Sequence, residues 1–152
     1  MTIEIPPLPP GYVLCPKGGR PPKVARDIAV FLALSWFVDH QRIHTKKAAE
    51  WIIEQFNFSE RSEVRRSRRK AMRVLTGPWF VMATDKVIVF FPARRGGVGP
   101  LPNSTGWAWC EGINEAVAVK ATNVEVNSVF GVADGYTVSI PWLDHNDFCP
   151  GP

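Results

Sequence analysis

The stretch from Ser59 to Leu75 limits the possible folds of this chain more than any other feature of the sequence. It reads SERSEVRRSRRKAMRVL and contains seven basic residues and two acidic residues. Charged side chains at this density stay in water, whereas Val64, Ala71 and Leu75 recur on or near one helical face. The stretch is therefore predicted to be a surface helix whose apolar side packs on a core.

Local signals set the expected ends of this helix. Asn57 tolerates the left-handed conformation that ends a preceding helix, and Phe58 is expected to anchor the turn in the core. Ser59 is the expected N-cap, and two glutamates in the first turn suit the positive end of the helix dipole. A Thr-Gly-Pro sequence follows at residues 76–78, so the helix is predicted from Glu60 to about Leu75.

The charge of the chain is unevenly distributed. Residues 59–75 carry a net charge of +5, the whole chain carries +4, and the remainder therefore sums to −1. The calculated pI is near 9.2. Such an imbalance favours a polyanionic partner, because it concentrates positive potential on one small part of the molecule.

The cations of this helix are the candidate binding residues. One helical face is predicted to hold Arg61, Arg65, Arg68 and Arg69, with Arg66, Lys70 and Arg73 on its flanks. An arginine can contact guanine through two hydrogen bonds or clamp a phosphate, and the flanking cations suit phosphates best. Lys46 and Lys47 could add backbone contacts. The alternative is that these charges only form a solvated helix face.

Two further helices are expected before the cationic stretch. The first is predicted from about Lys23 to Val38. It is apolar on nearly every side after Ile28, so the segment Ile28–Val38 is either buried all round or part of a homodimer interface. The second helix is expected to begin after Thr45 as its N-cap and to end near Phe56.

Beyond residue 75 the pattern changes from helical to strand-like. Segments 79–84 and 87–91 are rich in β-branched and aromatic residues and predict a hairpin. Further strands are expected at 107–111, 123–126, 129–133 and 136–140, with a two-residue turn at Asp134-Gly135. Segment 113–120 suits either a strand or a short helix.

These elements predict an α+β fold, in which an N-terminal three-helix, helix-turn-helix-like unit precedes a small antiparallel β-sheet. The expected parts are a proline-rich arm at 1–22, a helical unit with its hairpin at 23–91, a loop at 92–106 and a β-rich part at 107–152. A chain of this length is expected to form one domain, or one small domain with an appendage.

Residues 45–75 resemble a helix-turn-helix unit, since two helices are separated by a short break and the second helix is cationic. The Asn57-Phe58-Ser59 turn resembles the Gly-hydrophobic-Ser turn common in that class. Ile53 stands where that class usually has a small residue. With a helix before it and a hairpin after it, the region up to residue 91 is similar to a winged helix. The resemblance implies a cationic helix in the major groove of DNA and a hairpin wing on the flanking backbone.

The function expected from these observations is nucleic-acid binding, with duplex DNA as the partner, in a small transcriptional regulator of phage or mobile-element type. The alternative is a protein that binds an acidic surface on a nucleic-acid machine and inhibits it. Anti-CRISPR proteins, which bind CRISPR effector complexes, are an example of that class. Neither function requires catalysis, and no acid–base or nucleophile set stands out, so the chain is not expected to be an enzyme.

The proline-rich arm contains a second candidate. Lys17 to Lys23 resembles the Arg-Pro core of minor-groove AT-hooks, which would place Arg20 in a narrow DNA groove. Gly18 stands where that motif has arginine. The alternative is a loop that leads into the first helix, with proline in its first turn.

Metal, cofactor and membrane sites are not expected. His40 and His44, and likewise His145 and Cys149, have a spacing that suits zinc on a helix, but no Cys-x-x-Cys accompanies them. Cys110 is expected to be a buried thiol. The apolar run Ile28–Val38 is too short to span a bilayer. With no signal peptide and an odd number of cysteines, the chain is expected to be cytoplasmic and reduced.

Six tryptophans leave one question open. Trp107 and Trp109 are predicted on one face of a strand. They could stack on bases or anchor a protein partner, or they could fill the core of a small sheet.

Overall fold

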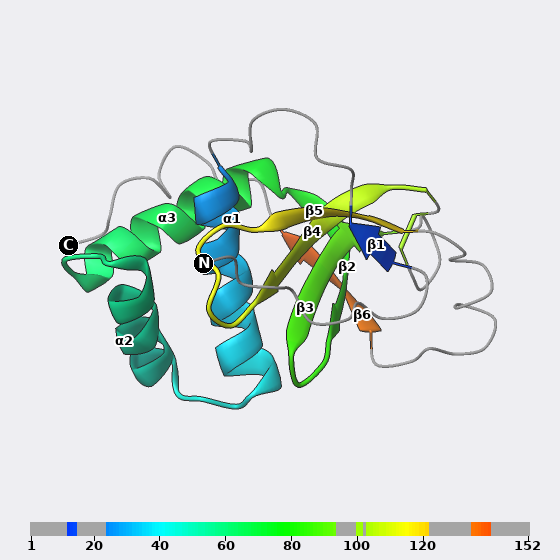
Figure 1. The fold of residues 1–152 in the computed structure, drawn as a ribbon. Coiled ribbons are helices and arrows are strands. Elements are labelled where there is room, and N and C mark those ends of the chain that lie inside the picture. The colour runs from blue at the N-terminus through cyan, green and yellow to red at the C-terminus, as the bar shows by residue number, and fades with distance from the viewer. Residues whose placement is uncertain (1–11, 15–23, 94–99, 102, 122–134, 141–152) are drawn as a thin grey trace.

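The computed structural model describes residues 12–14, 24–93, 100–101, 103–121 and 135–140 (Figure 1). The helices are α1 (Ala25–Ser35), α2 (Thr45–Phe56) and α3 (Arg61–Val74), and the π-helical turn η1 (Trp36–His40) continues α1. The strands are β1 (Tyr12–Leu14), β2 (Gly77–Ala83), β3 (Val87–Pro92), β4 (Thr105–Cys110), β5 (Val117–Ala121) and β6 (Gly135–Ile140). The predicted α+β class, with helices preceding an antiparallel sheet, is confirmed.

The strands form one antiparallel sheet in the order β1-β5-β4-β3-β2-β6. Strands β2 to β5 are neighbours in sequence order, so the strands before and after segment 92–106 belong to the same sheet. Segment 113–120, which suits two structures by sequence, becomes a strand from Val117. The strands predicted at 123–126 and 129–133, and Asp134 of the predicted turn, lie outside the described residues.

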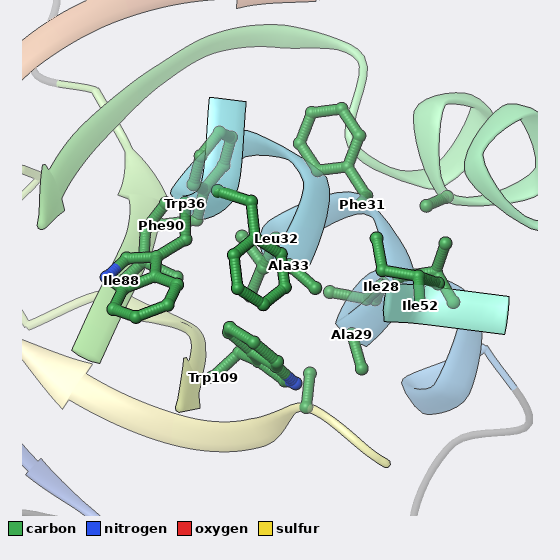
Figure 2. Close-up of a cluster of buried hydrophobic side chains, with 14 of the residues drawn as sticks. Ile28, Ala29, Phe31, Leu32, Ala33, Trp36, Ile52, Ile88, Phe90 and Trp109 are labelled. Atoms are coloured by element: carbon green, nitrogen blue, oxygen red, sulfur yellow. The ribbon is translucent and has the colours of Figure 1, made fainter. Parts of the chain in front are cut away.

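All three helices lie on one side of the sheet, and α1 is the central helix (Figure 1). It contacts α2 and α3 as well as β3 and β4. Figure 2 shows the core at this position, where Ile28, Leu32 and Trp36 meet Ile88 and Trp109. A second buried cluster, formed mainly by alternate residues of the strands, contains Phe80, Met82, Val87, Val89, Phe91, Ala108, Cys110 and Val119.

The apolar helix α1 is buried along most of its length within the single chain, whereas Leu34, Ser35 and Val38 are half-buried. Residues 28–33 are at most 6% exposed, and Trp36 and Phe37 are at most 5% exposed. A homodimer interface through Ile28–Val38 would need these side chains at the surface, whereas α2, α3 and the sheet already cover them. Most of the segment Ile28–Val38 is therefore core, and a homodimer interface through it stays a prediction.

The first helix also ends differently from the prediction. It continues past Val38 to His40 through η1, where the N–H of Gln41 donates to the carbonyl oxygen of Trp36 at 2.8 Å. Two adjacent residues of this wider turn, Trp36 and Phe37, are buried. Both rings contact the Trp109 ring edge-on, with centroids 5.8 and 5.9 Å away.

The ends of α2 and α3 correct two predicted caps. The cap of α2 is His44, not Thr45, because the His44 Nδ1 accepts a hydrogen bond from the N–H of Lys46. The residue before α3 is Glu60, not Ser59, and it has an extended backbone. Ser59 is instead held by its N–H, which donates to the Glu63 carboxylate at 3.1 Å.

Candidate functional site

The orientation of α3 is fixed by one buried stripe. Val64, Ser67 and Ala71 are buried, and Leu75 continues the stripe beyond the last turn. These residues follow helical spacing and pack against α1 and α2. The Ser67 hydroxyl donates to the Asp27 carboxylate of α1 at 2.5 Å, which fixes the rotation of α3 about its axis. The remaining circumference of the helix therefore faces away from the core.

The basic residues occupy that outward circumference. Those exposed are Arg61, Arg65, Arg66, Arg68, Lys70 and Arg73, and Arg69 is half-buried. We call these seven residues the cationic surface of α3. They lie on α3, which Figure 1 shows along one edge of the helical layer. The structure thus contains the predicted surface helix, with an apolar side on the core and basic residues on the outward side.

One flank of the cationic surface borders a groove between α2 and α3, of about 530 Å³. Arg61, Arg65 and Arg68 line it from α3, and Lys46 lines it from the first turn of α2. The guanidinium carbon of Arg68 also lies 5.9 Å from the centre of the Phe31 ring. The predicted face of Arg61, Arg65 and Arg68 is therefore a real cluster, whereas Arg69 does not line this groove.

The other flank borders a smaller polar crevice of about 360 Å³ between α3 and the start of α1. Arg66 and Lys70 line it together with Arg26, Asp27 and Glu63. Arg26 was not among the sequence candidates, because it is far from α3 along the chain. It donates to the carbonyl oxygen of Phe56 at 2.7 Å and lies 4.5 Å from the centre of the Phe58 ring. Arg26 therefore holds the turn between α2 and α3.

The two acids of α3 are used at the start of the helix. Glu63 accepts from the Ser59 backbone, and Glu60 accepts from the Ser62 hydroxyl at 2.6 Å. Both carboxylates thus lie in the first turn, where they complement the helix dipole. Beyond Glu63, the rest of α3 carries only basic charges, and two of them, Arg66 and Lys70, share the crevice with Glu63.

The turn between α2 and α3 has the expected left-handed residue. Asn57 has φ 58° and ψ 45°, and its N–H and that of Phe58 both donate to the Ile53 carbonyl oxygen. Phe58 is half-buried and stacks on Phe56 with ring centres 6.0 Å apart. Ile53 is also half-buried and packs against the core.

The hairpin of β2 and β3 differs from a projecting wing. Its outer neighbours are β6, beside β2, and β4, beside β3, so both strands lie inside the sheet. Their alternate side chains are buried in the two core clusters. Asp85 and Lys86 at the tip are exposed. A contact between this hairpin and a partner would therefore involve the tip, not a free strand edge.

The other candidates are placed as follows. Lys47 is exposed on α2 but does not line the groove, and Arg20, His145 and Cys149 lie outside the described residues. Trp109 is fully buried and Trp107 packs against the same core cluster, so the core-packing alternative holds. Burial raises the pKa of the Cys110 thiol, as expected for a buried cysteine. Within the described ranges, no group of three or more His, Cys, Asp or Glu side chains could hold a metal ion.

Comparison with protein-family models, curated proteins and solved structures finds no match to this chain. In the part of the chain that the structure describes, no helix is long and apolar enough to cross a membrane.

Proposed function

We propose that this protein binds nucleic acid, with duplex DNA as the expected partner, through the cationic surface of α3. The observation that carries the proposal is the concentration of seven basic residues on one outward-facing helix of an otherwise nearly neutral chain. A rigid helix anchored by Val64, Ser67 and Ala71 holds these charges in a fixed arrangement. Fixed cations bind a regular array of phosphates at a lower cost in side-chain ordering than a mobile tail would.

The arrangement of the two flanks supports a partner that touches both sides of α3. Arg61 and Arg65 lie on the groove side, whereas Arg66 and Lys70 lie on the crevice side. An α-helix with side chains fits the major groove of DNA, whose walls are two phosphate strands. Cations on both flanks of one helix would then face both strands, and the exposed residues between the flanks would face the bases.

The proposal is tested by the salt dependence of binding. Fluorescence anisotropy would be measured with labelled duplex DNA, single-stranded DNA and RNA across a salt series. Each lost phosphate contact makes the negative slope of log K against log salt shallower by about 1. Arg65→Ala/Arg66→Ala is therefore expected to make the slope for duplex DNA shallower by about 2 and to weaken binding.

The control compares Lys120→Ala with Arg65→Ala, since each variant removes one positive charge and Lys120 is exposed on β5 of the sheet. Lys120→Ala is expected to keep a slope within about 0.5 of the original protein. Absence of binding to all three nucleic acids at low salt and micromolar protein would exclude the proposal. An equal loss in Lys120→Ala and Arg65→Ala would show that net charge, not α3, is responsible.

A further inference from the structure

The groove between α2 and α3 differs from the rest of the cationic surface because its floor is apolar. Leu34, Val38 and Ala49 line it and are half-buried, and the buried Val64 completes the floor. Phosphate contacts need no such floor, since phosphates bind charged and polar groups. Apolar surface left open to water at this position favours a ligand that has an apolar part of its own.

The rim of the groove is strongly positive. Arg61, Arg65 and Arg68 on α3 and Lys46 on α2 are exposed cations, whereas Asp39 is the one carboxylate among the described residues that line the groove. His44 also lines the groove, and its Nδ1 accepts a hydrogen bond from the N–H of Lys46. A ligand of this groove should therefore carry negative charge on both sides of its apolar part.

Two classes of ligand combine negative charge with an apolar part, namely single-stranded nucleic acid and an acidic amphipathic protein segment, and the chemistry of the floor distinguishes them. An unpaired base is recognised by stacking on aromatic rings or arginine planes. The described floor is aliphatic, formed by leucine, valine and alanine. Aliphatic floors suit aliphatic or aromatic side chains, which amphipathic helices insert at i, i+3 or i+4 spacing.

We infer that this groove binds an acidic amphipathic segment of a protein partner, with its apolar side chains on the floor and its carboxylates on the rim. This inference goes beyond the proposed binding of nucleic acid and does not depend on it. The two partners would share Arg61, Arg65 and Arg68, so the protein segment and duplex DNA are expected to compete. The crevice flank with Arg66 and Lys70 would take no part in binding the protein segment.

The test uses the full chain and a labelled synthetic peptide of about four helical turns. Its leucines recur at helical spacing and glutamates fill the other positions. A scrambled peptide of the same composition keeps the charge and loses the apolar face. Anisotropy at about 0.15 M salt, where the Debye length is about 8 Å, is expected to show at least about tenfold tighter binding of the amphipathic peptide.

Two matched pairs of variants localise the binding. Ala49→Phe fills the floor without changing any charge, whereas Ser62→Phe adds the same ring at an exposed, uncharged position on α3 that does not line the groove. Lys46→Glu reverses a rim charge, whereas Lys47→Glu makes the same change outside the groove. Ala49→Phe and Lys46→Glu are each expected to weaken peptide binding about tenfold relative to their partners.

Each other outcome contradicts the inference. Equal affinity for the amphipathic and scrambled peptides would mean attraction by charge alone. Equal peptide affinities of Lys46→Glu and Lys47→Glu would place the peptide outside the groove. If thermal melting shows that Ala49→Phe does not fold, this pair of lysine variants alone tests whether the groove binds the peptide. Binding of single-stranded DNA that is lost in Ala49→Phe, without peptide binding, would assign the groove to nucleic acid.

Discussion

Ser67 is a polar residue buried in the packing surface of α3, and only 6% of it is exposed. Its hydroxyl donates to the Asp27 carboxylate across the contact between α1 and α3. A hydrogen bond to a charged group stabilises more than one between neutral groups, and the loss of one partner leaves the other unsatisfied. This hydrogen bond therefore adds to the packing of Val64 and Ala71 in setting the rotation that places the arginines outward.

The coupling between these two side chains is measurable. Ser67→Ala is expected to lower the free energy of unfolding by about 1–2 kcal/mol. A double-mutant cycle with Asp27→Ala should give a coupling energy of about 1 kcal/mol or more. Urea denaturation of the four proteins provides these values.

Ser62→Ala is the control, because this serine is exposed and its bond to Glu60 is also exposed. Its effect should stay within about 0.5 kcal/mol. Additive effects of Ser67→Ala and Asp27→Ala would contradict a role for the bond in fixing α3.

At the level of the helices, the sharp turn after α2 depends on the left-handed backbone of Asn57, with φ 58°. Asn57→Gly is expected to preserve stability within about 0.5 kcal/mol, because glycine enters this conformation freely. Asn57→Ala is expected to lower the free energy of unfolding by about 1 kcal/mol, since a Cβ disfavours this conformation. Urea denaturation compares the two, and equal stabilities would contradict the argument.

Helix boundaries were predictable where one residue type carries the signal. Asn57 and the helical spacing up to Phe56 gave the correct end of α2. The caps at His44 and Glu60 were missed for a specific reason. A histidine nitrogen replaced the expected hydroxyl at α2, and the reach of Glu63 back to Ser59 shifted the start of α3.

Part of the candidate site could also be foreseen. Arg61, Arg65 and Arg68 share a groove because their spacing follows the helix, a local property. The contributions of Lys46 and Arg26 depend on how α2 and α1 pack against α3. No local pattern indicates that packing, so tertiary structure alone reveals the apolar floor and the second crevice.

For the whole molecule, α1 joins the outer helices to the sheet, so the described core is expected to unfold in one transition. Trp109 links the two layers, since it contacts Trp36 and its Nε1 donates to the Ile113 carbonyl oxygen at 2.9 Å. Trp109→Phe is expected to lower the free energy of unfolding by about 2 kcal/mol, through lost volume and the loss of one of the two hydrogen bonds that the Ile113 carbonyl accepts.

The half-buried Trp107 provides the matched control, and Trp107→Phe should cost about 1 kcal/mol or less. Helical circular dichroism and tryptophan fluorescence should give the same urea midpoint in both variants. Separate midpoints would contradict a single cooperative core.

The main difference between the expected and observed architecture arises at this largest scale. The sequence pattern correctly predicts that segments 79–84 and 87–91 pair with each other. It contains no signal that β6 and β4 pair with their outer edges, because those partners are distant along the chain. Sheet order depends on such long-range pairings, which is why a local hairpin resembled a free wing.

The position of α3 at one edge of the helical layer makes the charge distribution of the molecule asymmetric, with its positive end at α3. A net charge of +5 lies on residues 59–75, and the rest of the chain sums to −1. The field of a polyanion orients such a molecule so that α3 faces the polyanion before the two make contact. Its association rate with a polyanion should therefore exceed that of a variant whose equal net charge is spread evenly over the surface. The difference between the two rates should disappear as added salt screens the field.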